Sequence, residues 1–172
     1  MPMYLYLGDI TRMETDAIVN ADGTDLRRCP GICDAIFAAA DTEKLERACR
    51  KLGRCRIGQA VATPGCGLPC RYIIHVAGPG WYGGEPRERF LLAGCYQNAL
   101  HKAYLCSCRR VAVPLIFSGD CHMPRAASLR VAGAAIADFC QRHPSMEVTL
   151  VLYRQSIYDM AKRILGWEDA PS

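Results

Sequence analysis

Short apolar runs alternate with segments of helical periodicity along the whole chain, and this alternation restricts the choice of fold. The predicted strands cover residues 3–7, 17–19, 58–63, 71–77, 111–116 and 148–153. The predicted helices cover residues 34–52, 88–104, a segment that Pro124 opens, and 155–165. This order predicts an α/β fold, a three-layer α/β/α sandwich around a mixed, mostly parallel central sheet.

Turn-forming residues punctuate this pattern. Residues 64–69 read as a hairpin connection, so one pair of strands is expected to be antiparallel. Residues 20–23 read as a turn after a short strand, and Pro114 is expected to end its strand or to lie beside a bulge. The chain from Trp167 onward is expected to be a frayed tail.

Length and composition fit one domain over residues 1–172. The chain has 172 residues, of which 51% are hydrophobic and 22% charged, so it can bury a sizeable core. Its apolar runs fall short of the roughly 18–20 residues that a membrane span needs. The N-terminal residues show neither a basic segment nor a cleavage site, so we predict no signal peptide, a cytoplasmic location and no membrane partner.

Charge and cysteine content exclude other classes. The net charge is +4, and the arginines are scattered rather than clustered, so a nucleic-acid partner is not expected. The eleven cysteines include Cys29-x3-Cys33 but no spacing typical of a zinc site, so we predict no metal and no cofactor. Most thiols are expected to be small buried hydrophobes, whereas Cys29, Cys33 and Cys121 could face a site.

Ligands of parallel α/β sheets bind beyond the carboxyl ends of the strands, which directs attention to the loops after Val19, Pro114 and Tyr153. The chain resembles the macrodomain family of ADP-ribose-binding modules at and around these loops, from Met3 to about Leu165. The matching stretches are Gly8-Asp9-Ile10-Thr11, residues 16–21, Gly31-Ile32 with Ala35-Ile36, residues 58–60 and 63–65, residues 72–79, and Ser118-Gly119.

The resemblance implies a pocket with an adenine end and a ribose end. Asp9 would accept a hydrogen bond from the adenine amino group, with Ile10 beside it and Tyr153 near the ring. Asn20, followed by Ala21, would line the ribose end. The residues alone also permit a capping role for Asp9, an Asx-turn for Asn20 and ordinary core packing for Tyr153.

Two loops would hold the phosphates. The resemblance places Gly31, Ile32, Cys33 and the start of the following helix in the first loop, where backbone N–H groups and the helix N-terminus attract a pyrophosphate. The second loop would contain Ser118, Gly119, Asp120 and Cys121.

The chain departs from the family where the chemistry lies. Gly23 replaces an asparagine that orients the distal ribose in hydrolytic members, and Cys33 replaces their carboxylate, which here stands one position later as Asp34. Pro30 removes an N–H donor. Asp120 adds a charge that would repel a pyrophosphate by roughly 3 kcal/mol at about 5 Å and a dielectric of about 20.

We therefore expect a protein that binds ADP-ribose or a related adenine nucleotide, with de-ADP-ribosylation weak or lost. If it is an enzyme, it would be a hydrolase of ADP-ribosyl or O-acetyl-ADP-ribose esters with Asp22, Asp34 or Asp120 as the replacement carboxylate. A scaffold for RNA or another nucleotide and a thiol nucleophile built from Cys33, Cys121 and His122 are further alternatives. The partner would be ADP-ribose or an ADP-ribosylated protein, and the oligomeric state stays open.

Overall fold

The computed structural model describes residues 2–78, 86–116 and 123–171. Its strands are β1 (Met3–Leu7), β2 (Ala17–Asp22), β3 (Ala60–Pro64), β4 (Tyr72–Ala77), β5 (Arg110–Pro114) and β6 (Glu147–Leu152). Its helices are the 3-10 turn η1 (Ile10–Arg12) and the α-helices α1 (Ile32–Ala39), α2 (Thr42–Leu52), α3 (Pro86–Leu105), α4 (Arg125–Arg142) and α5 (Gln155–Leu165). None of these helices is long and apolar enough to span a membrane.

The strands form one six-stranded sheet in the order β1-β6-β5-β2-β4-β3. All neighbouring pairs are parallel except β3 and β4, which form the antiparallel hairpin that residues 64–69 predicted. The predicted mixed, mostly parallel sheet is therefore confirmed.

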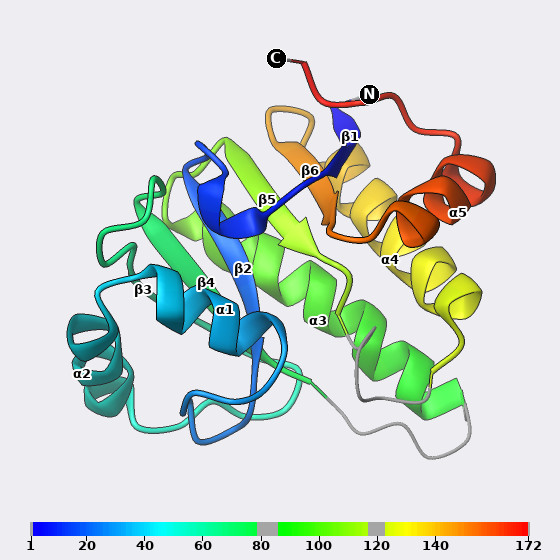
Figure 1. Cartoon of the computed structure of the whole chain (residues 1–172). Coiled ribbons are helices and arrows are strands. Elements are labelled where there is room, and N and C mark those ends of the chain that lie inside the picture. Colours follow the sequence, from blue (N-terminus) through cyan, green and yellow to red (C-terminus); the bar gives the residue numbers. More distant parts are fainter. Residues whose placement is uncertain (1, 79–85, 117–122, 172) are drawn as a thin grey trace.

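Alternating residues of the central strands feed two separate cores. In β2, Ala17 and Val19 pack with α3, α4 and α5, whereas Ile18 packs with α1 and α2. In β5, Val111 and Val113 face the first group of helices and Ala112 faces the second. This two-residue period buries both faces of the sheet, and Figure 1 shows α1 and α2 on one side and α3 on the other.

The predicted helix over residues 34–52 is wrong, because the chain forms two helices there. Ala40 adopts an extended conformation, and the Asp41 carboxylate accepts a hydrogen bond from Lys44 N, which makes Asp41 the N-cap of α2. The apolar period runs through both helices without revealing the break. The chain breaks there because Asp41 caps a new helix, even though the apolar pattern continues.

The predicted turn at residues 20–23 is also wrong. β2 continues to Asp22, since Asn20, Ala21 and Asp22 pair in register with His75, Val76 and Ala77 of β4. The polar side chains of Asn20 and Asp22 therefore extend from a central strand, on the face that α1 and α2 cover.

The C-terminal segment is not a frayed tail. Glu168 O accepts a hydrogen bond from Leu5 N at 2.9 Å, and Ala170 N donates to Leu5 O at 2.9 Å. The segment thus pairs with the outer edge of β1, which would otherwise present unpaired backbone groups.

The chain leaves neighbouring strands β2 and β5 toward opposite faces of the sheet. After β2 it continues to α1, and after β5 it continues to α4 on the far face. In α/β sheets, such a change of direction between adjacent parallel strands marks the carboxyl ends at which ligands bind.

Candidate functional site

The carboxyl ends of β1 and β6 bring Asp9 and Tyr153 together. Gly8 N donates to Leu152 O at 2.9 Å, so the residues that follow, Asp9 and Tyr153, leave the sheet side by side. Both are exposed, and 80% of the Tyr153 surface is open to solvent. Core packing of Tyr153, the alternative left open by the sequence, is therefore wrong.

Asp9 has a capping role through one oxygen. Its Oδ1 accepts hydrogen bonds from Thr11 N at 2.9 Å and Thr11 Oγ1 at 2.7 Å, which fixes the start of η1. The adjacent Ile10 is buried in the core on the α1 face. The capping alternative is thus confirmed for Oδ1, and the predicted contact with adenine would depend on Oδ2.

Gly31 opens α1, the helix that follows β2. Its φ of 89° and ψ of −139° belong to a region that residues with side chains rarely adopt, and no side chain caps the N-terminus of this helix. Ile32 is half-buried and Cys33 buried. The geometry leaves the exposed Gly31 turn as the part of the predicted first phosphate loop that a ligand can reach.

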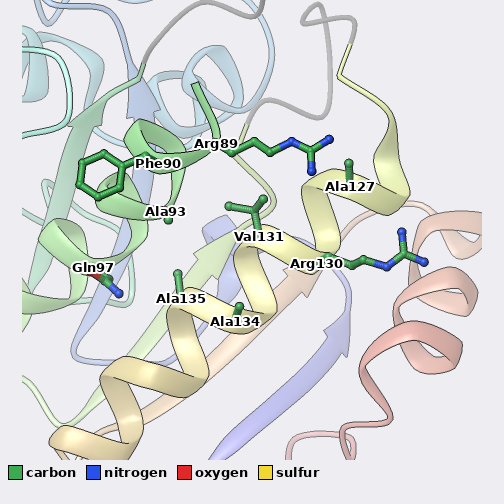
Figure 2. A pocket seen from close by; sticks show the side chains of 9 residues that line it. All are labelled: Arg89, Phe90, Ala93, Gln97, Ala127, Arg130, Val131, Ala134 and Ala135. Atoms are coloured by element: carbon green, nitrogen blue, oxygen red, sulfur yellow. The ribbon is translucent and has the colours of Figure 1, made fainter. Parts of the chain in front are cut away.

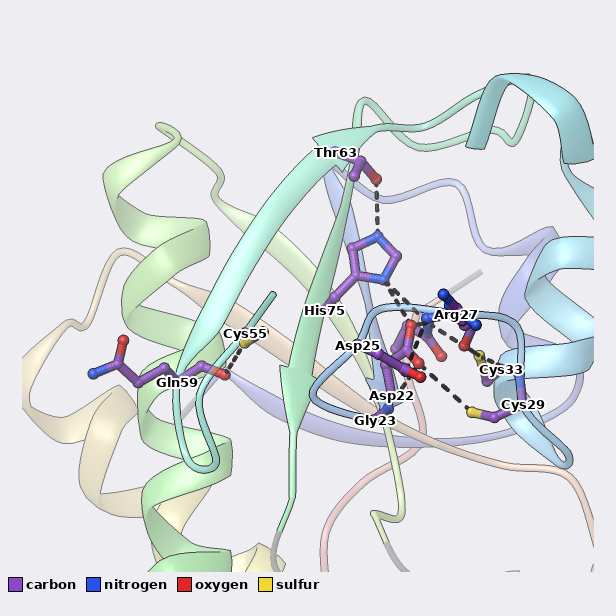
Figure 3. A network of polar contacts seen from close by, with 11 residues as sticks. Asp22, Gly23, Asp25, Arg27, Cys29, Cys33, Cys55, Gln59, Thr63 and His75 are labelled. Carbon is purple, nitrogen blue, oxygen red and sulfur yellow. Dashed lines mark hydrogen bonds and ion pairs between the residues drawn. The ribbon is translucent and has the colours of Figure 1, made fainter. Parts of the chain in front are cut away.

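A buried polar network runs from β3 across β4 and β2 (Figure 3). Thr63 Oγ1 lies 2.9 Å from His75 Nε2, and His75 Nδ1 lies 3.1 Å from Asn20 Nδ2 and 3.7 Å from Asp22 Oδ2. Asn20 has no exposed area, so it lies beneath the surface of the predicted ribose end. The network shows how four polar strand residues are held inside an apolar sheet.

The network continues into the loop between β2 and α1. Asp22 Oδ1 accepts hydrogen bonds from Gly23 N at 2.7 Å and from Cys29 Sγ at 3.6 Å. Cys33 Sγ lies 3.3 Å from Cys29 N and 3.8 Å from Asn20 Nδ2. Asp22, Cys29 and Cys33 each place one potential metal-ligating atom within 4.8 Å of the other two.

Burial disfavours ionisation of these thiols in the absence of a bound cation. It raises the pKa of Cys33 far above its usual value, and the nearby Asp22 carboxylate adds to the effect. Burial and Asp22 also raise the pKa of Cys29. Since the thiolate is the nucleophile, these pKa directions argue against the thiol-enzyme alternative for Cys33.

The two described candidate carboxylates have different surroundings. The Asp22 side chain is fully buried, whereas Asp34 points outward and forms an ion pair with Arg28 at 2.6 Å. Asp34 therefore turns away from the buried position that Cys33 occupies, as the shift of one helical residue predicts.

Some predicted residues lie outside the described part of the chain. They are Ser118, Gly119, Asp120 and Cys121 of the second phosphate loop, together with His122. Ala21 is described and is half-buried at the end of β2.

No role was predicted for His75 and Thr63 from the sequence. The sequence feature that could have identified them is a polar residue within an otherwise apolar strand. This feature becomes informative only when the parallel register of β2 and β4 is known, because that register sets His75 opposite Asn20.

A separate groove lies between α3 and α4 on the opposite face of the sheet from α1 (Figure 2). It combines the apolar side chains of Phe90 and Val131 with the guanidinium groups of Arg89 and Arg130. None of the predicted site residues that the structure describes contributes to its lining.

Comparisons with known proteins agree in sequence and in fold. A family model described as Macro domain matches residues 19–132. An Escherichia fergusonii protein named O-acetyl-ADP-ribose deacetylase is 37% identical over 168 residues, covering 95% of this chain and 94% of that protein.

Solved structures extend the similarity to three dimensions. The Oceanobacillus iheyensis macrodomain with ADP has a TM-score of 0.88 at 31% identity, covering 94% of this chain and 88% of that one. The Trypanosoma brucei macrodomain in complex with ADP-ribose has a TM-score of 0.87 at 26% identity, covering 96% and 69% of the two chains.

Proposed function

Because the chain belongs to the macro domain family, we propose that the carboxyl edge of its sheet binds ADP-ribose. The observation that carries the proposal is the position of Asp9 and Tyr153. They leave adjacent strands side by side, and both are exposed. A carboxylate beside an aromatic ring suits an adenine, whose amino group donates a hydrogen bond and whose face stacks.

The phosphates would lie toward α1. The Gly31 turn is exposed, and the N-terminus of an uncapped α-helix attracts anions through its backbone N–H groups and its dipole. The ligand would therefore extend from the ends of β1 and β6, across β5, to the end of β2.

The affinity is expected to be modest, micromolar or weaker. Pro30 lacks an N–H donor, and the charge of Asp120 would oppose the pyrophosphate by more than the roughly 1–1.5 kcal/mol that a neutral hydrogen bond contributes. Replacing this carboxylate in Asp120→Val should tighten ADP-ribose binding by at least about tenfold, since about 1.4 kcal/mol corresponds to that factor. Adenosine, which carries no phosphate, should bind both proteins equally.

Calorimetric titration with ADP-ribose, ADP, AMP and adenosine tests the proposal. We expect saturable binding of ADP-ribose at one site, and measurable binding of AMP through the adenine end. Absence of binding by all four ligands to the folded protein would contradict it.

We further propose that hydrolysis of ADP-ribosyl bonds is weak or lost. Asp22 is buried and already hydrogen-bonded, and Asp34 is paired with Arg28, so neither described carboxylate is free to act as a base at the carboxyl ends of the strands. Release of ADP-ribose from a modified acidic side chain should be far slower than about 1 s⁻¹, the lower end of ordinary enzyme turnover. Faster release that is abolished in Asp22→Asn or Asp34→Asn would overturn this proposal and name the group responsible.

A further inference from the structure

We propose that Asp22, Cys29 and Cys33 form a binding site for a thiophilic divalent cation of the Zn²⁺ type. The three ligands come from the end of β2, from the loop after it and from the first turn of α1. The site does not depend on the proposed nucleotide binding, and its test uses no nucleotide.

One pair of ligating atoms already stands at the distance that a tetrahedral zinc site requires, and the third atom is close to both. Zn–S and Zn–O bonds of about 2.3 and 2.1 Å at tetrahedral angles place sulfur and oxygen about 3.6 Å apart. Cys29 Sγ lies 3.6 Å from Asp22 Oδ1, and all three candidate atoms lie within 4.8 Å of one another. A cation can therefore enter with small side-chain rotations.

The donor types fit the same class of metal. Two sulfurs and one carboxylate oxygen favour zinc over Mg²⁺ or Ca²⁺, which prefer all-oxygen ligands. Three protein ligands leave a fourth position for water or another ligand. Cys33 is the second residue of α1, where the positive end of the helix dipole stabilises a coordinated thiolate.

An unpartnered buried atom provides independent support. Among the described residues, Asn20 Oδ1 is the one buried side-chain oxygen or nitrogen that has no hydrogen-bond partner. The Asn20 amide points into the cluster, with Nδ2 at 3.5 Å from Asp22 Oδ2 and 3.8 Å from Cys33 Sγ.

Exchanging the amide oxygen and nitrogen of Asn20 would set the amide oxygen against the Asp22 carboxylate, to which Nδ2 now donates at 3.5 Å. A buried polar group without a partner costs about 1–3 kcal/mol, so Oδ1 would be stabilised by a donor that the described residues do not supply.

The residues behind the ligands are arranged as in other metal sites. Asp22 directs Oδ1 toward Cys29, while Oδ2 accepts a hydrogen bond from Asn20 Nδ2, and the same amide nitrogen lies 3.1 Å from His75 Nδ1. Hydrogen bonds of this kind fix the orientation of a ligating carboxylate. The buried polar network of Figure 3 would thus orient the Asp22 ligand in addition to filling the core.

Metal titration of the purified, fully reduced protein tests the site. After removal of metal by a chelator, Co²⁺ is added as a spectroscopic probe, and Zn²⁺ is then used to displace it. We expect about one Co²⁺ per chain, a thiolate-to-cobalt charge-transfer band and the d–d bands of tetrahedral cobalt.

Ligand variants locate the site on the chain. Cys29→Ser, Cys33→Ser and Asp22→Asn should each weaken Zn²⁺ binding by more than about 100-fold, because hydrogen-bond partners behind ligands alone account for about 10–100-fold. Cys106→Ser is the matched control, since Cys106 is half-buried like Cys29 but packs with the core on the other face. It should bind Zn²⁺ as the wild type does.

Each remaining outcome decides the proposal. Absence of uptake, octahedral cobalt spectra, or equal binding by wild type and Cys29→Ser would overturn it. A Cys29–Cys33 disulfide that persists in reductant would also overturn the proposal. It would be detected as an intact mass that is lower by two hydrogens. If Cys33→Ser does not fold, the half-buried Cys29 decides alone, with unfolding temperature in added Zn²⁺ as the second readout.

Discussion

The two oxygens of the Asp9 carboxylate have separate tasks in the structure. Oδ1 accepts both hydrogen bonds from Thr11, whereas Oδ2 has no hydrogen bond to any residue that the structure describes and can be offered to a ligand. Asparagine keeps the capping oxygen and replaces the other with an amide nitrogen, which cannot accept a hydrogen bond. The substitution therefore separates folding from binding.

Asp9→Asn should leave the unfolding temperature close to that of the wild type and weaken ADP-ribose binding by about 1.5–3 kcal/mol, the range for a hydrogen bond to a charged group. Calorimetry measures the loss. A nucleotide of unsubstituted purine, which carries hydrogen in place of the amino group, serves as the control, because the wild type and the variant should bind it equally. An equal loss for both ligands would show that Asp9 does not contact the adenine amino group.

Other residues show the limit of what the sequence predicts. Roles for Asp9, Gly31 and Tyr153 could be predicted because the sequence around them resembles the macrodomain family. The Asp22–Cys29–Cys33 cluster could not, since only the Cys29–Cys33 spacing is visible in sequence and it matches no zinc pattern. Asp22 joins these cysteines because β2 continues three residues further than its apolar run.

At the scale of elements, the break between α1 and α2 is the clearest failure of sequence reasoning. Hydrophobic periodicity extends through it, because both helices bury residues on the same face of the sheet: Ile36 and Phe37 from α1, and Leu45 and Cys49 from α2. Periodicity reports which side chains are buried and not where the backbone bends. The capping residue Asp41 carried the missing information.

Asp41→Ala should destabilise the protein by about 1 kcal/mol, the typical cost of losing an N-cap side chain. Its Oδ1 accepts the Lys44 N–H at 3.2 Å, which belongs to the first turn, where N–H groups have no intrahelical acceptor four residues back. Chemical denaturation measures the change in the free energy of unfolding. Asp41→Asn is the matched control and should cost only a few tenths of a kcal/mol, because asparagine caps as well as aspartate; a full loss in this variant would contradict a capping role.

At the scale of the whole molecule, the two ends of the parallel strands have different roles. Their carboxyl ends carry the proposed site, whereas their amino ends are connected by the side chain of Asp16. Its carboxylate accepts hydrogen bonds from Arg109 N at 2.8 Å and Arg110 N at 3.0 Å at the start of β5, and it pairs with Arg71 beside β4. One side chain thus ties the beginnings of three strands together.

This fastening makes stability depend on pH. Burial opposes ionisation of Asp16, but the Arg110 and Arg109 amides and the charge of Arg71 outweigh it, so its pKa is lowered. A carboxyl group whose pKa is lower in the folded state stabilises the protein above its unfolded pKa. That contribution disappears as pH falls through the folded pKa.

Asp16→Asn should therefore cost about 1–2 kcal/mol at about pH 7, the range for hydrogen bonds to a charged group that is partly exposed. The difference from the wild type should begin to shrink below about pH 4 and vanish in stronger acid. Denaturation curves across this pH range measure the difference in the free energy of unfolding.

Asp138→Asn, at an exposed ion pair with Arg142 on α4, is the control and should change stability little at any pH. A constant difference between Asp16→Asn and the wild type from neutral to acid pH would show that the carboxylate charge is not what holds these strands. ADP-ribose affinity should be unchanged in both variants, because Asp16 lies at the edge of the sheet opposite the proposed site.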